Sequence, residues 1–163
     1  MVISSKINDI INEQINKELF SSYLYLSMAA YFESINFEGF ANWMRKQSNE
    51  ENNHAMKFFN YIYERGGKVT LKSIKEPKAE WKSPLDAFLE AYEHEKFITD
   101  SIYKILDAAK AEKDYATENF LAYYIKEQVE EEDSAVVIVE KLKQIGDNFS
   151  GLMIMDSRLG KRE

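Results

Sequence analysis

The sequence contains no cysteine, which excludes disulfide bonds, thiolate catalysis and zinc sites built from cysteine. It has only 6 Gly and 2 Pro, too few for an all-β chain that turns about every ten residues. No segment reaches about eighteen consecutive apolar residues, the length that a membrane-spanning helix needs. These absences favour a helical protein that does not span a membrane.

Basic residues are outnumbered, because 21 Lys and Arg stand against 28 Asp and Glu, a net charge of -7. Nucleic acid is therefore not an expected partner, since phosphate binding needs a basic face. The first residues show neither an apolar run nor a signal-cleavage pattern, so we expect a cytoplasmic protein. At this length, residues 1–163 suit a single domain with its own core.

Apolar periodicity and end signals predict four long helices and a short fifth. The predicted ranges are about Ser5–Ser34, Glu38–Arg65, Pro84–Glu112, Asp114–Ile145 and Phe149–Leu159. Ser83 can cap the third helix, and Pro84 suits its first position. Gly66 and Gly146 are typical of the left-handed residue that follows a helix.

The lengths of the connections predict how the helices are arranged. The first and second helices are joined by a few residues, as are the third and fourth, so each pair must be antiparallel. The connection over residues 66–82 can extend about 56 Å, longer than a long helix of about 45 Å, so the second and third helices can run parallel. The predicted fold is all-α: a four-helix bundle with one long crossover and a short C-terminal fifth helix.

Each long helix carries an apolar stripe at alternating three- and four-residue spacing, and a glutamate interrupts each stripe near its midpoint. The stripes read Ile11, Glu18, Tyr25, Phe32; then Phe40, Met44, Gln47, Glu51, His54, Phe58, Tyr61; then Leu85, Phe88, Tyr92, Glu95, Thr99, Ile102, Leu106; and then Leu121, Tyr124, Gln128, Glu131, Ala135, Ile138, Leu142. Because the helices are similar in length and lie side by side, we expect the four glutamates to meet at one level with His54 and Gln128.

The stripes contain no Lys or Arg that could neutralise these glutamates. Burying unpaired charges is costly, whereas two divalent cations would cancel a charge of about -4. Oxygen ligands with one imidazole suit iron or manganese. A single Glu in a stripe is usually a helix edge or a hydrogen-bonded core group, but four at matched depth, one with a His at i+3, predict a dinuclear metal site.

With these motifs the chain resembles the non-haem ferritins, especially bacterial ones, over essentially its whole length. The motifs are Glu18 with Tyr25, Glu50-Glu51-Asn52-Asn53-His54, Glu95, Glu127-Gln128-Val129-Glu130-Glu131, and the tail from Phe149 to Met153. The resemblance implies a ferritin-like fold and a ferroxidase that oxidises Fe(II) with dioxygen or peroxide. It also implies storage of ferric mineral inside a hollow homo-oligomeric shell of about twenty-four subunits.

The resemblance also implies roles for individual residues. The implied iron ligands are Glu18, Glu51 and His54 for the first iron; Glu51, Glu95 and Glu131 for the second; and Glu50, Glu127, Glu130 and Glu131 for a third, weaker site. Gln128 would hydrogen-bond nearby, and Tyr25 would donate an electron during oxygen reduction. Acidic runs such as the one from Glu130 to Asp133 usually face solvent.

Several positions depart from relatives of this family. Haem-binding bacterioferritins have Met where this chain has Asn52, and a second E-x-x-H where it has Gln128-x-x-Glu131, so no haem is expected. Glu118 matches the first acidic position of the three-fold channel in animal ferritins. The second position falls on Leu121, which puts iron entry by that route in doubt.

His94 does not share a helix face with the predicted ligand Glu95, because adjacent residues lie about 100° apart around a helix. We therefore expect it at the surface or at an interface, and not among the ligands.

Three alternative functions are weighed against this one. A rubrerythrin-like di-iron peroxidase would carry a Cys-rich iron centre and a second E-x-x-H. A mini-ferritin that coats DNA often has a basic tail, whereas this chain has only Lys161-Arg162-Glu163. A purely structural bundle would not bury unpaired glutamates. Assembly size separates the classes: about twenty-four subunits for a ferritin, about twelve for a mini-ferritin and about two to four for a peroxidase.

Overall fold

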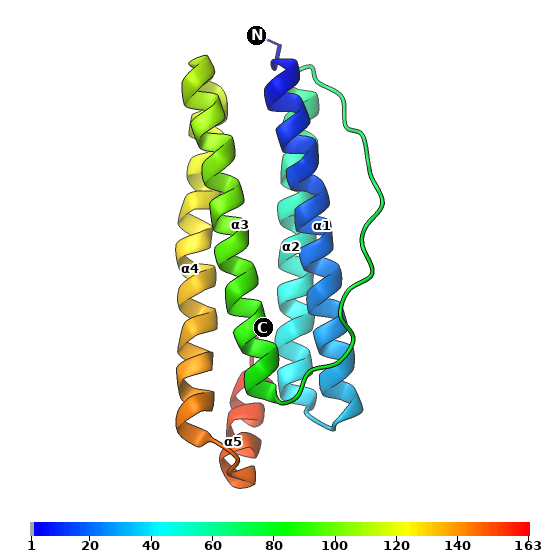
Figure 1. The fold of residues 1–163 in the computed structure, drawn as a ribbon, viewed down its shortest axis with the longest axis vertical. Helices are drawn as coiled ribbons and strands as arrows, with labels where there is room; N and C mark the ends of the chain where they lie inside the picture. Colours follow the sequence, from blue (N-terminus) through cyan, green and yellow to red (C-terminus); the bar gives the residue numbers. More distant parts are fainter. Residues whose placement is uncertain (1) are drawn as a thin grey trace.

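The computed structural model describes residues 2–163 as a bundle of five helices (Figure 1). The helices are α1 (Ser5–Ser34), α2 (Glu38–Glu64), α3 (Pro84–Glu112), α4 (Tyr115–Ile145) and α5 (Phe149–Leu159). The prediction of an all-α bundle is confirmed, and each helix boundary lies within one residue of its predicted place. Over these described residues, no helix has both the length and the apolar character needed to cross a membrane.

Side-chain caps are present at the starts of α1, α3 and α4, and the cap at Ser83 is the one that was predicted from the sequence. The side chains of Ser4, Ser83 and Asp114 each accept a hydrogen bond from the backbone N–H three residues later. Each bond satisfies one of the amide groups that a helix start leaves free. Gly66 and Gly146 have φ angles of 69° and 59°, in the left-handed region that favours glycine.

The crossover between α2 and α3 runs along the outside of α1 (Figure 1). Three asparagines spaced one helical turn apart on α1 hold its backbone. Asn12 Nδ2 donates to the Lys68 carbonyl at 2.9 Å, and Asn12 Oδ1 accepts from the Thr70 N–H at 2.7 Å. Asn8 binds Lys68, and Asn16 binds the carbonyls of residues 72 and 73. Because these bonds lead the crossover along the bundle, α2 and α3 run parallel, as predicted.

Helix α5 packs against the start of α2 through a close backbone approach. The Asp156 carboxylate accepts a hydrogen bond from the Phe40 N–H at 2.9 Å and so caps α2, whose own N-cap residue makes no side-chain bond. A Cβ on Gly39 would lie 1.7 Å from the Asp156 carbonyl oxygen. This contact therefore requires glycine at position 39.

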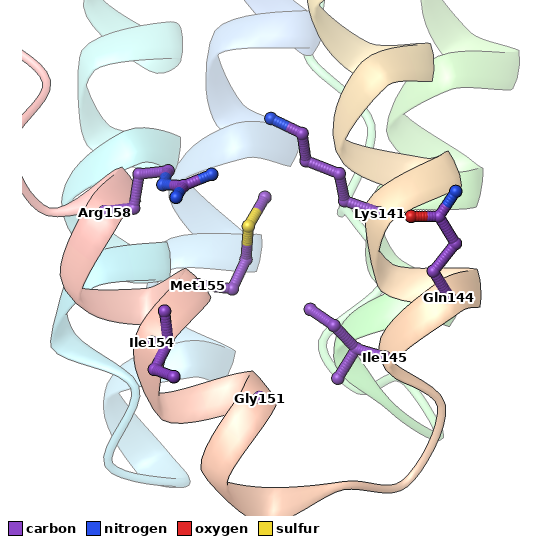
Figure 2. A pocket seen from close by; sticks show the side chains of 7 residues that line it. All are labelled: Lys141, Gln144, Ile145, Gly151, Ile154, Met155 and Arg158. Carbon is purple, nitrogen blue, oxygen red and sulfur yellow. The ribbon is translucent and has the colours of Figure 1, made fainter.

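On its other side, α5 and the end of α4 border a cavity of about 380 Å³ (Figure 2). Its lining residues are Lys141, Gln144, Ile145, Gly151, Ile154, Met155 and Arg158. Lys141 and Arg158 are its charged members, and none of the described lining residues is a carboxylate. This cavity therefore does not suit a metal ion.

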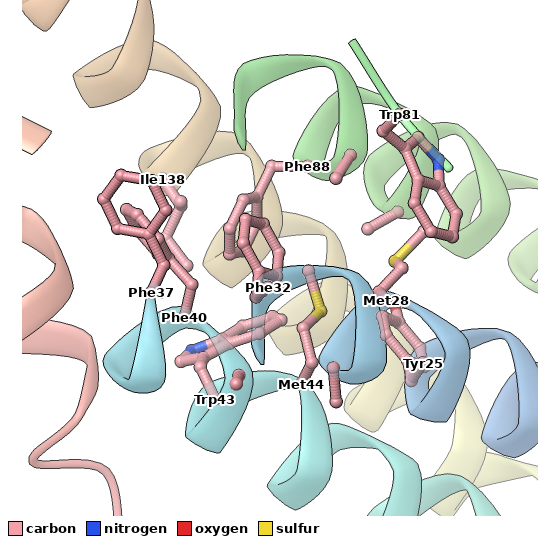
Figure 3. Packing of buried hydrophobic residues seen from close by; sticks show 14 of the residues in the cluster. Tyr25, Met28, Phe32, Phe37, Phe40, Trp43, Met44, Trp81, Phe88 and Ile138 are labelled. Atoms are coloured by element: carbon pink, nitrogen blue, oxygen red, sulfur yellow. The ribbon is translucent and has the colours of Figure 1, made fainter. Parts of the chain in front are cut away.

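The apolar core is divided into two clusters. One surrounds Phe32, Phe40 and Phe88, whose ring centroids lie 5.1–5.8 Å apart (Figure 3). The other includes Ile11 and Leu121, nearer the opposite end of the bundle. The buried polar side chains Glu18, Gln47, Glu51, His54, Glu95, Gln128 and Glu131 occupy the band between them. The two clusters thus form apolar walls on either side of one polar layer.

The asparagine contacts predict a specific loss of stability. Replacing Asn12 by Ala removes two hydrogen bonds to the crossover, so we expect the free energy of unfolding to fall by about 1–3 kcal/mol. Asn60→Ala, on an exposed position of α2, makes the same chemical change away from the crossover and serves as the control. Denaturant unfolding and limited trypsin cleavage at the crossover lysines measure the effect. Equal stability and cleavage in the two variants would contradict the proposed anchoring.

Candidate dinuclear metal centre

The four glutamates that interrupt the stripes lie together in the middle of the bundle. Their carboxylate oxygens and one imidazole nitrogen form two groups, and within each group the atoms lie within 4.8 Å of one another. The groups are Glu18, Glu51 and His54, and Glu51, Glu95 and Glu131. Glu51 belongs to both groups, so its carboxylate can bridge two cations. All five side chains are buried, and Glu131 is the most exposed at 7%.

The local geometry of α2 explains the pairing of Glu51 with His54. The two residues are three positions apart, which places them on one helix face. His54 Nδ1 lies 3.2 Å from Glu51 Oε2, and the Tyr124 hydroxyl donates to the His54 carbonyl at 2.7 Å. Helix α4 thereby adjoins the turn of α2 that carries the imidazole.

Two buried carboxylate oxygens have no hydrogen-bond partner among the described residues. They are Glu18 Oε2 and Glu51 Oε1, and both residues belong to the first group. A buried polar atom without a partner is costly and rare in native proteins. A divalent cation between these oxygens would supply the missing partner, and a donor set of carboxylates with one imidazole suits iron or manganese. The residues present therefore fit a pair of such cations.

Burial also raises the pKa of every carboxyl group in the two groups. Loss of solvent raises the pKa of Glu18 and raises that of Glu51 well above its usual range, where neighbouring carboxylates add to the effect. The pKa of Glu95 rises to about 7 and that of Glu131 to about 8, chiefly through burial. In the metal-free protein the raised pKa values favour the protonated forms of these groups, so metal ions compete with protons for the site.

Amide side chains hold the carboxylates from outside the two groups. Gln14 Nε2 donates to Glu18 Oε1 at 2.8 Å, and Gln47 Nε2 donates to Glu131. Sequence reasoning did not assign a role to either glutamine. Their spacing in the sequence could have indicated a role. Gln14 lies one helical turn before Glu18, and Gln47 lies one turn before Glu51.

Gln128 and Tyr25 both contact Glu95. Gln128 Nε2 donates to Glu95 Oε2 at 3.1 Å and to Thr99 Oγ1 at 3.2 Å. The Tyr25 hydroxyl donates to the other oxygen of Glu95. Burial, with the negative charge of Glu95, raises the pKa of Tyr25 well above its usual range, so the phenol stays protonated. Gln128 lies outside both groups and orients a carboxylate of the second.

The third group of possible ligands in the structure is not the set of residues that the resemblance implied for a third iron. The third group of possible ligands is His54, Glu127 and Glu131, and among the described residues Glu50 and Glu130 join no such group. Glu50 Oε2 instead lies 3.0 Å from an Arg162 nitrogen, and Glu130 is exposed. Glu50, Glu127, Glu130 and Glu131 nevertheless all line one cavity of about 220 Å³, here called the acidic cavity.

Two further residues that the sequence analysis singled out, His94 and Leu121, lie outside the dinuclear centre. His94 Nε2 lies 2.6 Å from Ser21 Oγ, so His94 sits between α3 and α1 and belongs to none of the ligand groups. Burial lowers the pKa of His94 to about 4. Leu121 is fully buried in the core and therefore cannot line a channel.

Comparison with known proteins adds an independent line of evidence. A family model described as a ferritin-like domain matches residues 8–145. The chain is 46% identical to the bacterial non-heme ferritin of Bacteroides fragilis, over 99% of this chain and 100% of that protein. It is 39% identical to the corresponding protein of Campylobacter jejuni, over 95% and 93%. A solved open-pore ferritin from the archaeon Archaeoglobus fulgidus matches at 52% identity with a TM-score of 0.99, over 100% of both chains.

The raised pKa values predict how the stability of the metal-free protein changes with pH. Glu95 binds a proton more tightly in the folded protein (pKa about 7) than in the unfolded chain (4.5). Its contribution to stability is present below about pH 4.5 and is lost as the pH rises towards 7. We expect the free energy of unfolding to fall over this window, and Glu95→Gln to remove on the order of 3 kcal/mol of that fall.

The control for this measurement is Glu93→Gln, which changes an exposed glutamate on the same helix. Denaturant unfolding of each metal-free variant at a series of pH values gives the comparison. If the stability of Glu95→Gln depends on pH as steeply as that of Glu93→Gln, the buried carboxyl groups do not hold the protons assigned to them.

Proposed function

Because the chain belongs to the ferritin family, we propose that it is an iron storage protein with ferroxidase activity. The proposal depends above all on one observation: two groups of possible ligands share the buried Glu51, and two of their carboxylate oxygens have no other partner. Fe(II) is the substrate of this centre, and ferric mineral is its product.

Charge and coordination explain why the site takes two ferrous ions. The first is held by Glu18, Glu51 and His54, and the second by Glu51, Glu95 and Glu131. Two ferrous ions carry a charge of about +4, which cancels that of the four carboxylates once their protons have left. The carboxylates are held in place by the neighbouring amides, so the ions enter a preformed site.

Oxidation removes one electron from each ferrous ion. The two electrons, with two protons, convert dioxygen to hydrogen peroxide, or convert peroxide to two molecules of water. The protons displaced from the carboxyl groups are available for this step. When dioxygen is reduced beyond peroxide, Tyr25 supplies a further electron to the peroxide, and its hydroxyl proton passes to Glu95 along their hydrogen bond.

The ferric product leaves the centre and mineralises in the hollow of a homo-oligomeric shell. Exposed apolar side chains support such an assembly, since interfaces are enriched in aromatic residues. Those on the long helices include Tyr23, Leu26, Tyr63, Phe97, Tyr103 and Val129.

A third, weaker iron is proposed to be held by Glu50, Glu127, Glu130 and Glu131. No haem is expected.

Ferroxidase activity is tested by adding Fe(II) to the metal-free protein in air. We expect Glu51→Ala to slow the appearance of ferric absorbance by at least about tenfold, because both ions lose a ligand. Glu64→Ala, an exposed glutamate on the same helix, should oxidise iron as fast as the wild type. Equal rates in the wild type and Glu51→Ala would mean that the buried glutamates are structural.

Assembly is tested separately by light scattering and by the iron retained in the high-mass fraction. We expect a particle of about twenty-four subunits that keeps the oxidised iron on size-exclusion chromatography. A dodecamer would indicate a mini-ferritin, and a dimer or tetramer would indicate a peroxidase.

A further inference from the structure

The C-terminal tail lies along α2 and reaches the acidic cavity. The Asp156 contact with α2 places α5, and the chain then ends above α5 in the view of Figure 1. Asn42 Nδ2 donates to the carbonyl oxygens of Gly160 and Arg162, at 3.3 Å and 3.2 Å. The backbone of the last residues is thereby held beside the second turn of α2.

The Arg162 side chain is fixed by several directed contacts. Its Nη1 donates to Gln47 Oε1 at 2.9 Å and to the Trp43 carbonyl at 3.3 Å. Its Nη2 lies 3.0 Å from Glu50 Oε2, and its Cζ lies 4.7 Å from the centre of the Trp43 ring. A guanidinium with hydrogen bonds, an ion pair and an aromatic face occupies a defined position.

The position of the Arg162 guanidinium matters because the acidic cavity around it is lined by glutamates. Four glutamates line the cavity, and Arg162 is the only basic residue among the described residues that line it. The guanidinium therefore already pairs with Glu50, one of the carboxylates that a metal cation in this cavity would meet. Glu50, which forms this ion pair, is absent from the third ligand group of His54, Glu127 and Glu131.

Gln47 connects Arg162 to the dinuclear centre. The Gln47 side chain accepts from Arg162 through Oε1 and donates to Glu131 through Nε2. Glu131 belongs both to the second ligand group and to the group beside the cavity. A cation that displaced Arg162 would thus change the contacts of Glu50 and of the amide that holds Glu131.

We propose that Arg162 is a built-in, displaceable counter-cation of the acidic cavity, which competes with a divalent cation for the cavity carboxylates. This inference rests on the proposed dinuclear centre, whose third ion would bind in the cavity. With Arg162 in place, the cavity binds a further divalent cation weakly. When the side chain leaves, the cavity regains a full negative charge and binds the cation more tightly.

The test measures binding of Zn²⁺, a redox-inert probe, to the assembled metal-free protein by isothermal titration calorimetry. We expect two tightly bound ions per subunit in the wild type and in Arg162→Gln. In Arg162→Gln a further ion should bind at least about tenfold more tightly than in the wild type, since a neighbouring positive charge is gone. The gain should disappear in the double variant Arg162→Gln with Glu50→Gln.

Two control variants separate charge from other effects. Lys161→Gln removes the same charge from the adjacent exposed residue and should bind Zn²⁺ as the wild type does. Arg162→Lys keeps the charge but loses the planar contacts, and should also stay close to the wild type.

The proposal is overturned if Arg162→Gln binds the further ion no better than the wild type. It is also overturned if Lys161→Gln or Arg162→Lys shows the same gain, because net charge or tail packing would then be the cause. Failure of the dinuclear centre gives a different result: the wild type would lack the two tight ions, or Glu51→Ala would keep them.

Discussion

The burial of four glutamates at one level of a helical bundle is the constraint on which the rest of this structure depends. Their carboxylates form two groups that share Glu51, and within each group the ligand atoms lie within 4.8 Å of one another. Burial and neighbouring carboxylates raise the pKa values of these groups. Such a layer is unfavourable by itself. It persists because two apolar clusters, one on each side, hold the four helices together. The same arrangement leaves oxygens free for cations.

The long crossover follows from the need to bring ligands from four helices to that level. If α2 and α3 were joined by a short turn, they would be antiparallel, and the order of the helices around the centre would differ. Most side chains of the crossover are exposed, although Trp81 near its end is buried in one apolar cluster and Val69 packs against the other. Between its ends, its path is set by polar bonds from α1, of which the shortest are those of Ser27 with Lys78 and of Asn12 with Lys68 and Thr70. A polar connection therefore sets the geometry of a site that it does not touch.

The fifth helix connects the far end of the bundle to the centre. Gly39 allows α5 to approach α2 closely, and Asp156 caps α2 at that point. These contacts direct the tail along α2, so that Arg162 enters the acidic cavity. Arg162 thus supplies the one basic side chain among the described residues that line the acidic cavity.

Local patterns in the sequence were enough to predict much of this protein. Pro84 and Gly146 marked helix ends because their backbone preferences are local. The glutamates could be predicted as a group because helix periodicity places Glu51 and His54 on one face and similar helix lengths align the midpoints. The length of residues 66–82 was enough to predict that this connection can span the bundle.

Tertiary structure decided the contacts between residues distant in the sequence. Arg162 has no periodic relation to Glu50, and their ion pair exists only because α5 docks on α2. The assignment of Glu50 to the third site came from family resemblance, and the ion pair that Arg162 forms with this carboxylate could not be predicted from the sequence. The sequence by itself determined which side chains must lie at the centre of each helix, since periodicity is a local property. Only the folded chain decided which partner each carboxylate meets, since those partners come from other helices and their distances depend on packing.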